Sequence, residues 1–141
     1  MKNIALLVLG LFSVAAMAAK TESFKMYTQP HAKPNPNCDT YTALDIQYGK
    51  AGITATLVNR VGGACELFVE PNPRTYIAPR EAKKDACGRI IYSYLARGTG
   101  EPIFKLVDHR NTVCDMMIPA LIVVTEVDEK GNEYPLYSLD H

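Results

Sequence analysis

The chain has 141 residues, with 15 Lys and Arg residues balanced by 15 Asp and Glu residues, so its formal net charge is zero. This length supports one domain, and the charge balance argues against nucleic acid or another partner recognised through a broad electrostatic field. With 48% apolar and 21% charged residues, the composition is that of a globular protein, which excludes a wholly disordered chain.

Residues 1–18 have the three parts of a secretory signal peptide. Lys2 gives a positive start, Ile4–Ala15 is apolar, and the small residues Ala16 and Ala18 precede a predicted cleavage site. The apolar run is shorter than the roughly 20 residues of a membrane-spanning helix, which makes a retained anchor the weaker alternative. We therefore predict an exported protein, periplasmic or extracellular, that does not span a membrane after cleavage.

Residues 19–37 are predicted to form an extended, Pro-rich amino-terminal arm, because closely spaced prolines disfavour a helix. From residue 38 to residue 141, apolar and polar residues alternate in short runs that Gly-containing turns separate, a pattern typical of β-strands. The predicted strands are residues 44–48, 53–57, 65–69, 75–78, 89–95, 103–107, 120–127 and 133–139.

Three positions refine this prediction. Val61–Gly63 is expected to be a turn, and Asp128–Asn132 is expected to be the loop of a β-hairpin. Pro135 predicts that the last strand lies at a sheet edge, because proline lacks the N–H donor that an interior strand needs. The sequence thus predicts a single all-β domain, a small disulfide-bonded sandwich or barrel of about eight short antiparallel strands.

An even number of cysteines in an exported protein predicts two disulfides. The four are Cys38, Cys65, Cys87 and Cys114. The sequence leaves three pairings open, but the equal outer spacings suggest an internal duplication that relates residues 38–69 to residues 87–118. That symmetry favours one bridge within each segment over bridges between them. The cysteines are too widely spaced for a structural zinc site, whose ligands usually come in close pairs.

One proline-rich connection within residues 71–76 is predicted to be a stiff binding loop. Its candidate residues are Pro71, Pro73, Arg74, Thr75 and Tyr76. Stiffening lowers the entropic cost of binding, and a displayed arginine is the residue type that trypsin-like proteases recognise. Inhibition of a protease through this loop is therefore an alternative function.

A polar cluster of Asp108, His109 and Arg110 follows the predicted strand 103–107. An imidazole beside a carboxylate is a pair that nucleophilic hydrolases use, although a solvated turn is the commoner role. The sequence contains no nucleophile motif or cofactor fingerprint, so we assign no catalytic, cofactor-binding or metal-binding residue. A small hydrolase whose site assembles only in three dimensions is the second alternative.

The leading functional prediction is an exported binding or interaction module rather than an enzyme. A loop-rich β scaffold is well suited to displaying binding residues, and the sequence offers no local catalytic constellation. The predicted partner is a protein or a small ligand, with no nucleic acid and no cofactor. A structural role in the cell envelope is a third alternative.

Overall fold

The computed structural model describes residues 20–50, 52–63, 71–79, 83–95, 102–114 and 118–139. The predicted signal peptide and the predicted strand 65–69 lie outside this part of the chain. The described residues contain no helix and form one antiparallel sheet of nine strands. The strands are β1 (Lys20–Tyr27), β2 (Cys38–Gly49), β3 (Gly52–Gly63), β4 (Arg74–Pro79), β5 (Lys83–Lys84), β6 (Ile90–Leu95), β7 (Pro102–Asp108), β8 (Ile122–Val127) and β9 (Glu133–Ser138).

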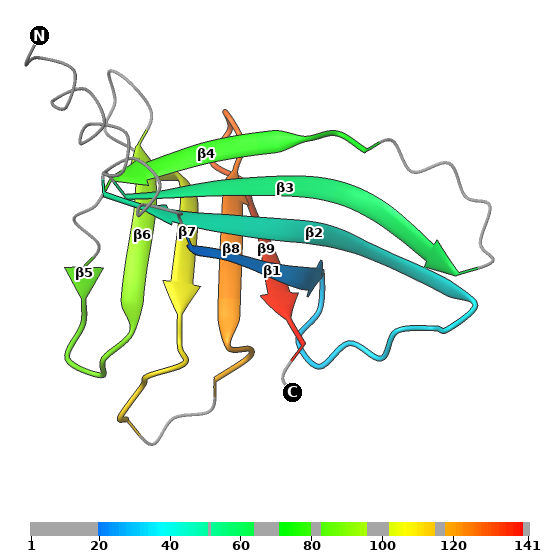
Figure 1. Cartoon of the computed structure of the whole chain (residues 1–141), viewed down its shortest axis with the longest axis horizontal. Helices are drawn as coiled ribbons and strands as arrows, with labels where there is room; N and C mark the ends of the chain where they lie inside the picture. The colour runs from blue at the N-terminus through cyan, green and yellow to red at the C-terminus, as the bar shows by residue number, and fades with distance from the viewer. Residues whose placement is uncertain are drawn as a thin grey trace, which may run out of the picture.

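The strand order is β4-β3-β2-β1-β9-β8-β7-β6-β5, so the first and last strands meet in the middle of the sheet. Their contact is short, because only Met26 and Tyr27 of β1 pair with Ser138 and Tyr137 of β9. At this junction the sheet curls, and β2–β4 cross over β6–β8 in a second layer (Figure 1), with β4 in contact with β6. The all-β prediction is confirmed, and the architecture is a single curled sheet.

The core lies between the two layers and follows the alternation of the strands, since successive side chains of a strand point to opposite faces. Its buried residues are Met26, Leu44, Ile46, Ile53, Ala55, Leu57, Ala78, Phe104, Leu106, Ile122, Val124 and Leu136. The ring of Tyr76 in β4 stacks on that of Phe104 in β7, with centroids 4.5 Å apart. This contact joins two strands that are not neighbours in the sheet.

Two local predictions were too conservative about the extent of pairing. Val61–Gly63 is not a turn, because these residues continue β3 and pair with the first residues of β2, from Cys38 onward. Residues 20–27 of the predicted arm form β1, which pairs with β2 over most of its length. Both differences arise because β2 is longer than its alternating segment and offers partners beyond it.

The edge prediction for the last strand is wrong, since β9 lies between β8 and β1. Pro135 is tolerated there because β1 pairs only with Tyr137 and Ser138, so the backbone at Pro135 needs no donor toward β1. The predicted hairpin loop between β8 and β9 is confirmed. Within it, the N–H of Asp128 donates to the carbonyl of Asn132 at 3.0 Å.

The disulfide between Cys87 and Cys114 is present, with Cα atoms 5.1 Å apart, and it brackets the β6–β7 hairpin. Cys38 is also disulfide-bonded, whereas Cys65 lies outside the described residues, so the pairing predicted for those two stays a prediction. Both segments of the proposed duplication contain a hairpin, β2–β3 and β6–β7. Their common ancestry remains a hypothesis.

Candidate functional site

The inward-facing positions change from apolar to polar where the strands reach the two ends of the core. At one end, which we call the Asn59 end, the inward positions are Thr42, Asn59, Arg74, Glu126 and Tyr134. At the opposite Arg110 end they are Glu22, Tyr48 and Asp108, joined by Arg110 from the following turn. Polar side chains that face inward are stable only when hydrogen-bonded. Their partners within the protein therefore show which donors and acceptors at each end are left for a ligand.

A bidentate ion pair between Arg74 and Glu126 connects the two layers at the Asn59 end. Arg74 Nε and Nη2 donate to the two carboxylate oxygens of Glu126 at 2.7 and 2.8 Å. The Tyr76 hydroxyl donates to the same carboxylate at 2.6 Å. The two paired side chains keep only 21% and 16% of their exposure. Their charges therefore neutralise each other inside the protein and are not displayed to a ligand.

These contacts also fix protonation states at the Asn59 end. Burial, and then the hydrogen bond to Glu126, raise the pKa of Tyr76 to about 12. The hydrogen bonds to Glu126 also raise the pKa of Arg74, although burial opposes them. Tyr76 is consequently a neutral donor and Arg74 a cation throughout the physiological pH range.

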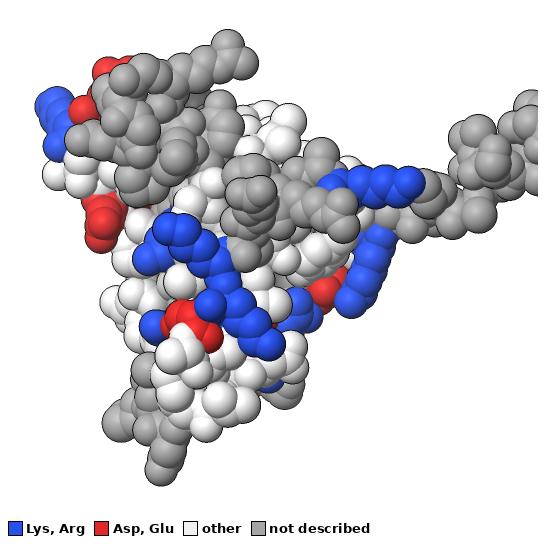
Figure 2. Space-filling model, turned by 90° about the vertical axis from the view of Figure 1, so that its left-hand side faces the viewer, with Lys and Arg blue, Asp and Glu red and all other residues white. Residues whose placement is uncertain are grey.

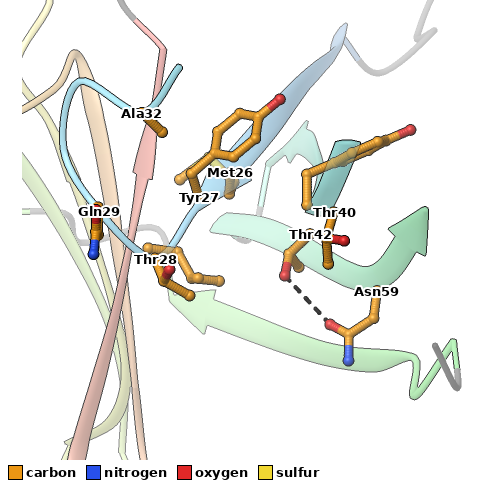
Figure 3. Close-up of a pocket in the computed structure, with 10 residues that line it drawn as sticks. Met26, Tyr27, Thr28, Gln29, Ala32, Thr40, Thr42 and Asn59 are labelled. Carbon is orange, nitrogen blue, oxygen red and sulfur yellow. Dashed lines mark hydrogen bonds between the residues drawn. The ribbon is translucent and has the colours of Figure 1, made fainter. Parts of the chain in front are cut away.

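The side-chain amide of Asn59 is oriented by two donors. Arg74 Nη1 and Thr42 Oγ1 each lie 3.3 Å from Asn59 Oδ1. Because a guanidinium group can only donate, the atom that faces Arg74 must be the amide oxygen, and Nδ2 must point the other way. Figure 3 shows the oxygen turned toward Thr42 and the nitrogen turned away from it. Within the described ranges, no residue accepts a hydrogen bond from Nδ2.

Asn59 forms part of the wall of two adjacent hollows. The first has a volume of about 410 Å³ and opens where β1 ends between β2 and β9. Its lining residues are Met26, Tyr27, Thr28, Gln29, Ala32, Thr40, Tyr41, Thr42, Asn59 and Leu136. Residues from the β1–β2 connection face those of β2 and β3 across it (Figure 3). The described lining thus consists of hydroxyls, amides, two phenols and an apolar floor, with no charged side chain.

The two tyrosines of the first hollow are held by charges that lie behind them. The Tyr27 hydroxyl donates to Asp39 at 3.0 Å, and the Lys25 ammonium lies 4.7 Å from the centroid of the Tyr41 ring. Burial, followed by the bond to Asp39, raises the pKa of Tyr27 to about 12. Lys25 and Asp39 also pair with each other, at 3.4 Å. The wall of the hollow is therefore neutral and its rings are restrained.

The second hollow, of about 340 Å³, lies on the other side of Asn59. It is lined by Asn59, Asn72, Arg74, Tyr76, Glu126, Val127, Asp128 and Tyr134. The Asp128 carboxylate is occupied, since it accepts hydrogen bonds from the backbone of Lys130 and Asn132 and from the Tyr134 hydroxyl. With Arg74 and Glu126 paired to each other, the charged groups of this hollow are already engaged within the protein.

The predicted inhibitory loop is mostly strand. Pro71 and Pro73 lie in an irregular segment, but Arg74, Thr75 and Tyr76 belong to β4. The guanidinium of Arg74 points inward to Glu126, whereas recognition by a trypsin-like protease requires an exposed basic side chain. Arg74 and Tyr76 form part of the wall of the second hollow. Protease inhibition through this loop stays a prediction.

The predicted polar cluster lies at the Arg110 end. Arg110 Nε and Nη2 donate to the carboxylate of Asp108 at 3.0 and 2.8 Å, and Arg110 also pairs with Glu22 of β1. Hydrogen bonds from Arg110 lower the pKa of Asp108, although burial opposes them. His109 is buried rather than solvated, and its backbone N–H donates to the backbone carbonyl of Leu121. Asp108 and Arg110 are brought together, but as an ion-pair network that closes this end.

Other charges project into solvent. Lys and Arg side chains cross the side of the molecule that carries β5 and β6, with acidic side chains among them (Figure 2). Lys83 and Lys84 of β5 are exposed, and Arg89 pairs with Asp85. None of these four residues lines either hollow.

The comparisons with known proteins identify no relative: no family model, no curated protein and no solved structure matches this chain. No helix among the described residues is long and apolar enough to cross a membrane. The functional assignment therefore depends on the geometry of the site alone.

Three residues of the site escaped the sequence analysis, namely Thr42, Asn59 and Glu126. A signal for them does exist, because each lies two residues from a buried aliphatic residue on the same strand face: Leu44, Leu57 and Val124 respectively. A polar residue at an inward-facing position of a strand is therefore the sequence signal that could have identified each of them.

Proposed function

We propose that this protein is a binding module for a small, uncharged ligand rich in hydrogen-bonding groups, which it holds beside Asn59, where the two hollows adjoin. The observation that carries the proposal is the Asn59 amide. Its oxygen is engaged by Arg74 and Thr42, and its two N–H donors are directed away from both. A donor held in a fixed orientation at the wall of a cavity is a pre-organised recognition element, since binding need not order it.

The chemistry of the first hollow favours a neutral ligand. The hydroxyls of Thr28 and Thr40 can both donate and accept, so they match hydroxyl or amide groups of either polarity. The Thr42 hydroxyl donates to Asn59 and can still accept. Leu136 keeps 7% exposure in the lining of the hollow and offers a small apolar contact, behind which Met26 is fully buried. A charged ligand would lose hydration here without meeting an unpaired opposite charge in the described lining.

Binding is better supported than catalysis by the residues of the two hollows. Their described linings contain no imidazole, thiol or serine hydroxyl. Glu126 and Asp128 are carboxylates, but each is already fixed by several hydrogen bonds from within the protein. These contacts favour structural roles over proton transfer to a ligand.

The substitution Asn59→Asp tests the proposal selectively. It keeps an oxygen for Arg74 and Thr42 but replaces the N–H donors with a second acceptor oxygen. The matched control is Gln47→Glu, which makes the same charge change at an exposed position of β2. Probes are maltose, cellobiose and the neutral peptide N-acetyl-trialanine amide, with citrate as a charged comparison, followed by calorimetry and by amide chemical shifts.

We expect at least one neutral probe to shift the amides around the first hollow, and Asn59→Asp to weaken its binding about tenfold, the loss of one buried hydrogen bond. Gln47→Glu should bind as the wild type does. The proposal is overturned when the two variants bind alike, or when citrate binds at this hollow and the neutral probes do not.

A further inference from the structure

We infer that the ligand is a neutral oligosaccharide chain that passes over Asn59 and occupies both hollows. This inference rests on the proposed function and extends it from a single hollow to an elongated site. Its basis is the pair of hollows that share Asn59, together with the position of Tyr134 beside the second of them.

The sizes of the two hollows and the residue that they share, Asn59, favour an elongated ligand. Their volumes of about 410 and 340 Å³ each lie in the lower part of the range for small-ligand pockets, about 300–1,000 Å³. A compact ligand would fill one of them and leave the other empty. A chain of linked units can enter both, and the Asn59 donors then lie beside its middle.

Tyr134 provides a platform in the second hollow. Among the described residues it is one of three large apolar side chains that are exposed, at 55%. It nevertheless lies at an inward position of β9, opposite Glu126 of β8. Its hydroxyl donates to Asp128 at 3.1 Å, and the same carboxylate is anchored by the hairpin backbone. The ring is thus held in one orientation while its surface stays open.

A restrained, open tyrosine ring is suited to the C–H face of a sugar ring, because it offers a flat apolar surface with little conformational entropy to lose. At the far end of the first hollow, Tyr27 and Tyr41 lie with ring centroids 6.4 Å apart. Both hollows therefore contain tyrosine rings. The polar groups between them are hydroxyls and amides, together with Arg74, Glu126 and Asp128, whose charges are engaged within the protein.

A sugar chain fits better than a peptide. Peptide sites read alternate side chains in apolar pockets, whereas Val127 is the single aliphatic side chain in the described lining of the second hollow. Over the described linings of both hollows taken together, residues with side-chain hydroxyls and amides outnumber the charged ones, and they match the dense and adaptable hydroxyls of a sugar.

The experiment is a chain-length series, with cello-oligosaccharides and malto-oligosaccharides from the monosaccharide to the hexasaccharide titrated into the folded, oxidised protein. We expect affinity to rise by about tenfold or more as the chain becomes long enough to reach the second hollow. Tyr134→Ala should remove that increase and leave the binding of the shortest ligands unchanged. Ile77→Ala is the matched control, since Ile77 is equally exposed (62%) on β4 but lines neither hollow.

The outcomes separate the two proposals. If affinity does not depend on chain length, or if Tyr134→Ala and Ile77→Ala have the same effect, the oligosaccharide inference is wrong while Asn59-dependent binding still stands. If no saccharide in either series binds and the neutral peptide does, the inference is again overturned. If saccharides bind but Asn59→Asp does not weaken them, the proposed function fails as well.

Discussion

The contact between the two layers at the Asn59 end can be tested by replacing Glu126 with glutamine, which preserves size and removes the charge. The carboxylate accepts three hydrogen bonds, two from Arg74 and one from Tyr76, and bonds to charged groups contribute about 1.5–3 kcal/mol each. Breaking a fully buried pair costs about 3–5 kcal/mol. Because these side chains keep 16–21% exposure, water can replace part of the loss, and we expect the free energy of unfolding to fall by about 2–3 kcal/mol.

A double-mutant cycle separates the ion pair from simple truncation. Arg74→Met alone leaves Glu126 without its cation and should be about as harmful as Glu126→Gln. Combining Arg74→Met with Glu126→Gln leaves no charge behind, so the double variant should lose less than the sum of the two single changes, by about 1–2 kcal/mol. Glu133→Gln, an exposed carboxylate of β9, is the control and should change stability by less than about 0.5 kcal/mol.

Urea unfolding at pH 7 with the disulfides intact, followed by circular dichroism, measures these differences, since the chain contains no tryptophan. The reasoning fails if Glu126→Gln shifts the midpoint no further than Glu133→Gln. It also fails if the two single changes add without any coupling, because the pair would then not act as a unit.

Three further changes test other parts of the structure. Phe104→Ala should lower the unfolding free energy by about 3–5 kcal/mol, because Phe104 is fully buried; the urea midpoint measures this. Replacing Cys87 and Cys114 with serine should lower the unfolding free energy by about 3 kcal/mol according to the chain-entropy model, since the bridge closes a loop with a sequence separation of 27. Urea unfolding without reductant measures this difference. An unchanged midpoint would contradict the prediction and would mean that the loop is already ordered in the denatured chain. Burial raises the pKa of Asp108, but the hydrogen bonds and the positive charge of Arg110 together hold it below its usual value. The Asp108 carboxylate therefore stabilises the fold above about pH 4, and this stabilisation is lost as the pH falls. Asp108→Asn should flatten the acid limb of the curve of unfolding free energy against pH.

Much of the fold could be read from local alternation, and the errors came from pairing between distant segments. The runs around Leu44, Ile53 and Val124 alternate cleanly and became β2, β3 and β8. The position of β9 beside β1 depends on a contact between the first and last strands of the described chain, which no local pattern encodes. The edge prediction based on Pro135 was wrong because a proline removes one backbone N–H donor and leaves the other residues of the strand able to pair.

The candidate site was less predictable, because its inward-facing residues come from five strands and their roles depend on their partners. Arg74 was chosen from the sequence as a displayed basic residue, yet its role depends on Glu126, 52 positions later in the chain. Nothing near Arg74 indicates that partner. What the sequence does show is polar residues in inward register, and the curled sheet then gathers them at one end of the core.

The two ends of the core follow one plan but leave different chemistry available. Each is bridged by an Arg–Glu pair between layers, Arg74 with Glu126 and Arg110 with Glu22. Arg110 also engages Asp108, so its donors are taken up by carboxylates. At the Asn59 end Arg74 donates to one carboxylate, to the backbone carbonyl of Asn72 and to the Asn59 amide, and that amide keeps its own N–H donors. Because the charges there are matched internally, recognition at that end falls to neutral hydrogen bonds and aromatic faces, which is the chemistry of an uncharged polar ligand.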